Sequence, residues 1–251
     1  MLKVSIITAV YNNHAYIEQC ILSVQSQTYP NIEHIIIDGN SNDGTLEIIR
    51  KYQKQGYQWI SEPDNGIYDA LNKGIGLASG DIIGLLHSDD QFANPFIIEN
   101  VVARFTNTDC DATYGDLLYI SRTDPPGTIR YWKSCPFNAN LFRKGWMPAH
   151  PTLFMKKSIY DTFGLFNVKY RIASDYDLML RTVGSGKLKC EYLPEIITHM
   201  RVGGASNKSF INIWLKSYED WQALRTNKMG GLYTLFLKNF SKLGQFFHKR
   251  G

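Results

Sequence analysis

The feature that most constrains the fold is an alternation, over residues 1–120, of short apolar runs with segments whose apolar side chains recur at helical spacing. The apolar runs, each short enough for a buried strand, cover residues 4–8, 32–38, 59–60, 82–86 and 111–120. The helical segments lie between them, at residues 17–24, 46–52 and 70–78. This order predicts an α/β fold with a doubly wound, mostly parallel sheet that is flanked by helices on both faces.

The pattern changes after residue 120. Residues 121–149 combine several Pro and Gly with five aromatic side chains, which predicts a long loop region. Helical patterning resumes at residues 157–163 and 176–183, and a last helix is predicted over 231–249. On a helical wheel one arc of this helix is apolar and holds Leu232, Leu235, Phe236, Phe240, Leu243, Phe246 and Phe247. The opposite arc holds Lys238, Lys242, Gln245 and Lys249, which predicts a basic, amphipathic C-terminal extension over residues 206–251.

Polar residues follow three of the apolar runs, at residues 8–13, 38–45 and 87–90. Ligands of such sheets bind beyond the carboxyl ends of the strands, where these segments are expected to meet. None of them has the G-x-G-x-x-G or G-x-x-x-x-G-K-[ST] spacing. This absence argues against a dinucleotide-dependent oxidoreductase and against a phosphate-loop NTPase.

Asp89 and Asp90 are adjacent carboxylates just after the run at residues 82–86. Mg²⁺ and Mn²⁺ bind through one or two carboxylates together with substrate phosphate oxygens, so the pair predicts a metal that neutralises a diphosphate. A simpler interpretation is that one carboxylate caps the following helix. The acidic, glycine-rich turn that starts at Asp38 is likewise open to two interpretations, a turn that binds a flat ring or a plain strand-to-helix turn.

Five motifs, taken in order, resemble the inverting family-2 glycosyltransferases with the GT-A fold. They are residues 4–12, 23–29, 38–45, the segment 72–81 with 86–90, and 175–181. The resemblance covers about residues 3–205. It implies a GT-A domain over residues 1–205, in which about 1–115 bind the nucleotide-sugar and about 116–205 face the acceptor.

The resemblance also implies which residues bind the donor. The positions implied for the nucleotide-sugar are Thr8, Ala9, Tyr11, Asp38, Asn72 and Asp89. Among them, Asp38 would accept a hydrogen bond from a uracil-type N–H group, and Asp90 would ligate Mn²⁺ or Mg²⁺. The chain departs from the family at Gly39, where many members have a second aspartate, and at His87, where many have the leading aspartate of the metal motif.

On the acceptor side the resemblance implies a carboxylate that deprotonates the attacking hydroxyl. Asp175 occupies the family's acidic motif and precedes an apolar-periodic helix, so we expect it to be the catalytic base; its alternative role is to interact with the helix dipole. Asp177 and Arg181 are four residues apart and predict a structural ion pair. Trp146 and His150 are expected to contact the acceptor, although burial between the two halves is the simpler interpretation.

The charge of the chain is concentrated at its end. The net charge is +4, and residues 201–251 hold nine Lys and Arg against two Asp and Glu. Without a recognisable nucleic-acid-binding motif, this tail argues against a nucleic-acid partner and favours contact of residues 231–250 with an anionic membrane surface. No apolar run approaches the ~20 residues that span a bilayer, so we expect a cytoplasmic enzyme, peripheral on the inner face of the cell membrane.

The predicted function is metal-dependent, inverting transfer of a sugar from a nucleotide diphosphate-sugar, expected to be a UDP-sugar, to a hydroxyl of a saccharide or lipid-linked acceptor in bacterial surface polysaccharide synthesis. Two alternatives stay open. A sugar-nucleotide nucleotidyltransferase would need a glycine-rich, basic phosphate loop, and residues 8–13 contain neither Gly nor Lys. A non-catalytic sugar-nucleotide-binding protein would not need Asp38, Asp89, Asp90 and Asp175 together.

Overall fold

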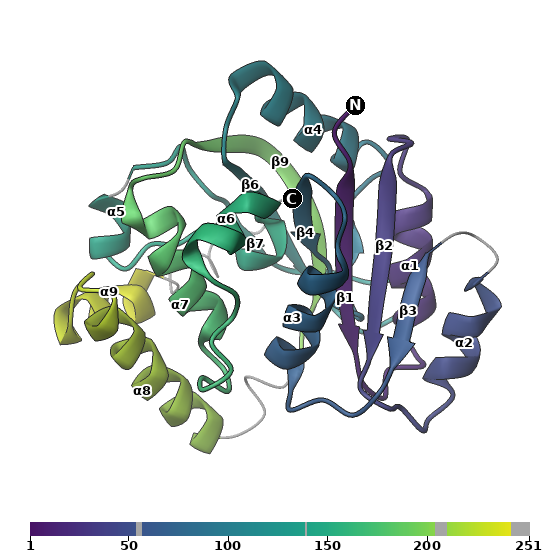
Figure 1. Ribbon diagram of the computed structural model, residues 1–251. Helices are drawn as coiled ribbons and strands as arrows, with labels where there is room; N and C mark the ends of the chain where they lie inside the picture. The colour runs from purple at the N-terminus through teal and green to yellow at the C-terminus, as the bar shows by residue number, and fades with distance from the viewer. Residues whose placement is uncertain (54–56, 139, 204–209, 242–251) are drawn as a thin grey trace.

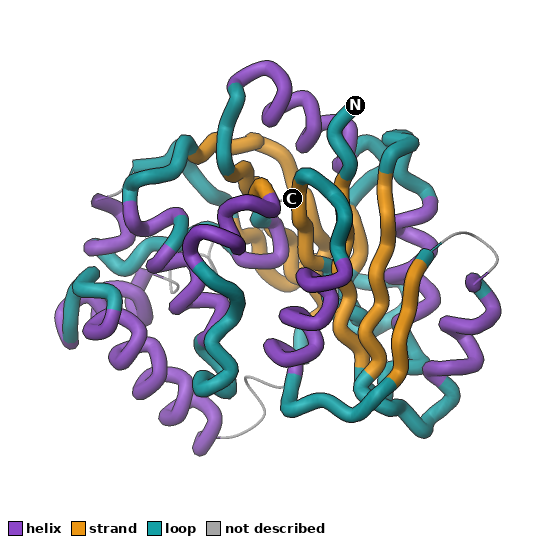
Figure 2. The backbone as a smooth tube through the Cα atoms, viewed as in Figure 1, coloured by secondary structure: helices purple, strands orange, loops and turns teal. Residues whose placement is uncertain are grey.

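The computed structural model describes residues 1–53, 57–138, 140–203 and 210–241. Its strands are β1 (Val4–Val10), β2 (Ile32–Asp38), β3 (Gln58–Ser61), β4 (Ile82–Leu85), β5 (Gln91–Phe92), β6 (Ala112–Ile120), β7 (Thr128–Trp132), β8 (Phe154–Lys156) and β9 (Cys190–Arg201). Within the described residues these nine strands form one sheet in the order β3-β2-β1-β4-β8-β6-β9-β5, and β7 pairs with β6. Figure 2 shows this sheet with helices on either side.

The helices connect and cover the strands. They are α1 (Ile17–Gln25), α2 (Thr45–Lys51), α3 (Ile67–Leu77), α4 (Ile97–Thr108), α5 (Asn140–Arg143), α6 (Lys157–Phe163), α7 (Ser174–Arg181), α8 (Phe210–Thr226) and α9 (Leu232–Ser241), with short 3₁₀ helices η2 (His150–Thr152) and η3 (Val183–Ser185). In Figure 1, α3 lies on one face of the sheet and α1 with α2 on the other.

The first strands are buried on both faces of the sheet, which explains why their sequences are continuously apolar. Every residue of β1 is buried. Ile7 and Ile35 pack on one face with Leu71 and Ile75 of α3, and on the other face the chain forms a second core with α1 and α4. The sheet is parallel from β3 through β2 and β1 to β4, so these four strands end at the same edge.

The predicted α/β class with its mostly parallel sheet is confirmed, and α6 begins and ends where the sequence indicates. The region predicted as a long loop instead contains β7 and α5. Sequence periodicity also missed β9, which pairs with β6 along its length. The register of this pair shifts between Tyr114 and Asp116, opposite Pro194, and this proline next to the charged Glu195 hides the strand pattern.

The prediction for the face of α9 is wrong at Lys238. This side chain is 1% exposed, and its Nζ lies 2.6 Å from Asp220 Oδ1 on α8 and 3.2 Å above the ring of Tyr176 on α7. Leu232 and Phe236, on the predicted apolar arc, are 73% and 54% exposed. The buried carboxylate of Asp220 supplies a countercharge that a helical wheel does not contain.

The C-terminal helices lie beside α7 in Figure 1. Residues 242–249 of the predicted amphipathic helix lie outside the described residues. Among the residues that are described, no helix is both long and apolar enough to cross a bilayer.

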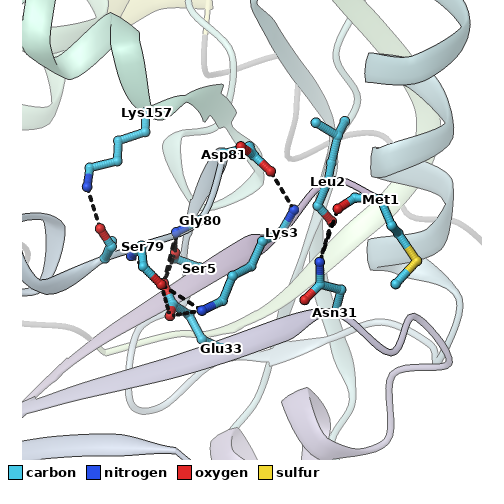
Figure 3. Close-up of polar contacts among 11 residues, drawn as sticks. Met1, Leu2, Lys3, Ser5, Asn31, Glu33, Ser79, Gly80, Asp81 and Lys157 are labelled. Carbon is cyan, nitrogen blue, oxygen red and sulfur yellow. Dashed lines mark hydrogen bonds and ion pairs between the residues drawn. The ribbon is translucent and has the colours of Figure 1, made fainter.

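The amino edge of the sheet carries a closed polar cluster, drawn in Figure 3. Glu33 is 6% exposed and accepts hydrogen bonds from the backbone N–H groups of Ser79 at 2.6 Å and Gly80 at 3.0 Å. It also accepts from the hydroxyls of Ser5 and Ser79 and forms an ion pair with Lys3 at 2.6 Å. The cluster ties β1 and β2 to the turn that leads into β4.

Candidate active site

The first part of the site is the turn after β2. Asp38 is completely buried. Its Oδ2 accepts hydrogen bonds from the Ser41 N–H at 3.0 Å and from the Ser61 hydroxyl at 2.6 Å, and its Oδ1 accepts one from the Ser41 hydroxyl. The carboxylate therefore shapes the turn between β2 and α2, and its predicted contact with a nucleotide base stays a prediction.

Gly39 leaves room beside Asp38 that another carboxylate fills. A methyl group on Gly39 would lie 2.5 Å from Asp64 Oδ2 and 3.4 Å from a ring carbon of Tyr11. Tyr11 is 63% exposed at the end of β1. Asp64, from the loop before α3, thus stands where a side chain at residue 39 would begin, so the edge keeps an acidic group near the exposed ring of Tyr11.

Three predicted donor residues have side chains that are used or buried elsewhere. Thr8 is buried, and its hydroxyl lies 2.9 Å from His34 Nε2, while Ala9 is 6% exposed. Both ends of the Asn72 amide bind the backbone of Phe166, at 2.9 Å each. We therefore leave the side chains of Thr8 and Asn72 out of the proposed donor contacts.

The two carboxylates of the predicted metal pair differ in access. Asp90 is completely buried; its Oδ1 accepts the Arg201 N–H at 3.1 Å, and its Oδ2 has no hydrogen-bond partner among the described residues. Burial raises the pKa of Asp90 well above its usual range, and the neighbouring Asp89 adds to the shift. The side chain of Asp89 is 23% exposed and is paired with Arg122 at 2.7 Å.

Two guanidinium groups that the sequence did not single out lie beside these carboxylates. Arg201, at the end of β9, donates to the Asp89 carbonyl oxygen at 2.7 Å. The guanidinium carbons of Arg201 and Arg122 lie 4.8 Å and 4.9 Å from the ring centre of Tyr16. They come from the end of β9 and from the turn after β6, so no local motif signals their convergence. This part of the edge is consequently both acidic and basic.

The predicted base and a residue predicted to contact the acceptor substrate are part of a series of side-chain contacts. Asp175 Oδ2, in the first turn of α7, lies 3.0 Å from His150 Nδ1 in η2. His150 Nε2 in turn lies 3.1 Å from Nε2 of His87, which follows β4. Burial lowers the pKa of His87 to about 4, and His150 contributes to the shift. The two predicted residues Asp175 and His150 are therefore in direct contact, and His87 contacts the other nitrogen of His150.

Asp175 is held in an ionised form by its surroundings. Burial by itself raises its pKa, but His150, and then Lys216 and Lys238, outweigh it, so the pKa lies well below its usual range. The Tyr68 hydroxyl lies 3.3 Å from Asp175 Oδ1. Asp175 is thus a carboxylate with one oxygen against a histidine and the other near a tyrosine hydroxyl.

The predicted ion pair of α7 is present, since Arg181 Nε lies 2.9 Å from Asp177 Oδ2. Trp146 packs with aromatic rings of the core, 5.9 Å from the ring centres of both Tyr114 and Phe142. The contacts of Trp146 in the described part of the chain are therefore those of a packed residue, and its expected contact with the acceptor stays a prediction.

Comparison with known proteins identifies the family. The model of Glycosyl transferase family 2 matches residues 5–163. The chain belongs to glycosyl transferase family 2. This family-2 glycosyltransferase is 32% identical over 190 residues to a glycosyltransferase of Mycobacterium tuberculosis, covering 75% of this chain and 70% of the relative. It is 28% identical over 208 residues to a PGL/p-HBAD biosynthesis glycosyltransferase of Mycobacterium bovis, covering 81% and 78%.

Solved structures show the same fold. TarS 1–349 of Staphylococcus aureus, in complex with UDP-GlcNAc, superposes with a TM-score of 0.71 at 16% identity and 90% coverage of this chain. The chain spans 65% of that TarS fragment, less than two thirds of its length. The mannosyltransferase PcManGT of Pyrobaculum calidifontis, in complex with GDP-Man and Mn²⁺, gives 0.67 at 17% identity, with 97% and 71% coverage. The expected GT-A fold is confirmed.

Proposed function

We propose that this family-2 glycosyltransferase transfers a sugar, with inversion, from a UDP-sugar to a hydroxyl of a saccharide or lipid-linked acceptor. The observation that carries the proposal is the convergence of groups at one edge of the sheet. Asn13 Nδ2 donates to Ser88 Oγ at 2.8 Å, which joins the loop after β1 to the segment of Asp89. The contact between His87 and His150 joins the same segment to Asp175.

The reaction needs one proton acceptor and one leaving-group stabiliser. The acceptor oxygen forms a bond to the anomeric carbon while the bond from that carbon to the diphosphate oxygen breaks, and its electron pair leaves with the nucleoside diphosphate. Asp175 takes the acceptor proton, a role that typically contributes about 10²- to 10⁴-fold. An ionised carboxylate held from both sides is suited to this role, because it is available as an acceptor and does not need to reorient.

Asp89 and Asp90 are the residues that would hold Mn²⁺ or Mg²⁺. The unpartnered Oδ2 of Asp90 fits such a group, since a buried oxygen without a hydrogen bond is rare in folded proteins. The described residues contain no group of three or more His, Cys, Asp and Glu that could form a metal cage, but these ions need only one or two carboxylates when a diphosphate supplies the rest. The sequence predicts Asp90 as the direct ligand, but its complete burial leads us to propose that the more exposed Asp89 binds the metal first. When bound, the metal stabilises negative charge on the leaving diphosphate.

The proposal is tested by incubating the protein with UDP-glucose, UDP-galactose, UDP-GlcNAc and GDP-mannose in Mn²⁺ or in EDTA, with and without a mixture of saccharide and lipid-linked acceptors. We expect release of a nucleoside diphosphate that depends on acceptor and metal. In a parallel incubation with UTP and a sugar 1-phosphate, formation of a UDP-sugar and pyrophosphate would instead support a nucleotidyltransferase. Tight binding of a donor with no turnover on any acceptor would support a binding protein.

A membrane surface is the setting we propose for this activity, with synthesis of bacterial surface polysaccharides as the pathway class. Leu232, Tyr233 and Phe236 of α9 are all more than half exposed, and apolar side chains on a surface helix suit an interfacial position. We expect replacement of all three by Ser to reduce flotation of the protein with anionic vesicles, without a change in turnover on a soluble acceptor. Unchanged flotation would remove α9 from the membrane contact.

A further inference from the structure

A continuous chain of three side chains joins the two halves of the site. Asp175 comes from α7, His150 from η2 and His87 from the segment after β4. We propose that His150 is a positioning residue, held by His87, that keeps the Asp175 carboxylate oriented toward the acceptor hydroxyl. The inference rests on the proposed function, because it requires Asp175 to be the base.

The positions of the hydrogens in the Asp175–His150–His87 contacts follow from the types of atom in contact. A carboxylate only accepts hydrogen bonds, so His150 carries a hydrogen on Nδ1 in either protonation state. The contact between the two Nε2 atoms, at 3.1 Å, then holds one hydrogen that one ring donates to the other. Turning the His150 ring over would break both contacts. The orientation of this ring is therefore fixed at both of its nitrogens.

The partners of Asp175 leave one oxygen for the acceptor. His150 occupies Oδ2 at 3.0 Å, whereas within the described part of the chain Oδ1 contacts only the Tyr68 hydroxyl, at 3.3 Å. That hydroxyl donates more closely to the Ile172 carbonyl oxygen, at 2.6 Å. Oδ1 is thus the oxygen with capacity for a new hydrogen bond.

Other groups around Asp175 come from the C-terminal helices. Lys216 of α8 and Lys238 of α9 lower its pKa together with His150, which has the largest effect of the three. Glu219 of α8 accepts the backbone N–H groups of Ile172 and Ala173 at 2.8 Å and 2.9 Å, which fixes the backbone just before α7. Loss of His150 would leave this backbone in place and would free only the carboxylate.

On the side away from Asp175, the series of contacts reaches the segment that carries Asp89 and Asp90. The carbonyl oxygen of His87 accepts the Asp90 N–H at 2.9 Å. Through His87 and His150, the base is therefore linked to the turn that carries Asp89 and Asp90. A histidine at residue 87 can donate to His150 or accept from it, whereas an ionised aspartate there could only accept.

Three variants of His150 separate its two contacts. His150→Phe removes both, His150→Asn retains a donor near the position of Nδ1, and His150→Gln retains a polar atom near the position of Nε2. We expect His150→Phe and His150→Gln to lower kcat roughly 10- to 100-fold, as misplacement of a reacting group by about 1 Å does, with donor affinity unchanged. His150→Asn is expected to recover a large part of this loss. In His150→Phe the acid limb of the kcat/KM profile should move to higher pH, because Asp175 loses the partner that lowers its pKa most.

His14→Asn is the matched control, since His14 forms a His–Asp pair with the same Nδ1–Oδ2 distance, 3.0 Å, but is 62% exposed. It should leave kcat and the acid limb unchanged. The inference is overturned if His150→Phe has the kcat and acid limb of the wild type, or if His150→Asn is no better than His150→Gln. It is also overturned if His150→Phe loses more turnover than Asp175→Asn, because a positioning residue cannot contribute more than the base that it positions. Wild-type turnover in Asp175→Asn would instead overturn the proposed function, whatever His150 does.

Discussion

Buried carboxylates at the amino and carboxyl edges of the sheet differ in how completely they are hydrogen-bonded. At the amino edge Glu33 is surrounded by donors from Lys3, Ser5, Ser79 and Gly80 (Figure 3). Burial would raise its pKa, but these donors lower the pKa of Glu33 to about 2. At the carboxyl edge Asp90 is buried, one of its oxygens has no partner among the residues that the structure describes, and burial raises its pKa.

This difference in hydrogen bonding indicates that Glu33 contributes to stability and that Asp90 contributes to function. A fully bonded buried carboxylate stabilises the fold, whereas an incompletely bonded one costs free energy and tends to persist where a ligand will use it. The amino edge therefore joins strands, and the carboxyl edge keeps bonding capacity for a substrate. Variants at the two edges should accordingly change different measured quantities.

The largest effect is expected for Asp89→Ala. Loss of the exposed carboxylate from the metal pair should reduce transfer about 10²- to 10³-fold, the size usual for removing one electrostatic stabiliser of a transition state. The free energy of unfolding should change by less than about 1 kcal/mol, because the Asp89–Arg122 pair is partly exposed. Turnover and denaturant unfolding on the same preparation check both parts. Wild-type turnover in EDTA would contradict the metal role.

Glu33→Gln should have the converse effect. The amide cannot accept all the hydrogen bonds of the carboxylate, so we expect a loss of about 1–3 kcal/mol in the free energy of unfolding, with turnover per folded molecule unchanged. The folded-state pKa is lowered from the ordinary 4.5 to about 2, so the stabilisation is present above pH 4.5 and is lost as the pH falls toward 2. Unfolding curves of wild type and variant should converge across that range. Curves that stay parallel would contradict this account of the amino edge.

Asp90→Asn should have only a small effect on stability. In EDTA, we expect the free energy of unfolding at neutral pH to stay within about 1 kcal/mol of the wild type or to rise, because the variant removes a buried charge that is incompletely bonded. The raised pKa predicts that wild-type stability from this group is present at low pH and is lost as the pH rises through the folded-state value. A loss as large as that of Glu33→Gln would show that Asp90 serves the fold as Glu33 does.

The first half of the fold could be predicted because its signals are local. The strands β1, β2 and β4 are buried on both faces, so their sequences are continuously apolar, and the helices between them show a clear period. β9 could not be found in this way, since it contains Pro194 and is defined by its pairing with β6. The face of α9 depends on Asp220, a distant residue in the sequence.

The candidate site was predictable only where one segment carries the signal. Asp89 and Asp175 lie in recognisable motifs, whereas Arg122 and Arg201 reach Asp89 from separate elements. His87 and His150 are 63 residues apart, and no spacing rule joins them. Asn72 lies in a motif, yet its amide binds Phe166, because the same segment also holds the fold together.

The most direct test of the central claim compares binding and turnover in Asp175→Asn. Calorimetry should give an affinity for UDP within a few-fold of the wild type, because we propose that Asp175 faces the acceptor and not the nucleotide. Turnover should fall about 10²-fold or more, since the amide cannot take the acceptor proton. A variant that binds UDP and still transfers at the wild-type rate would contradict the assignment of Asp175 as the base.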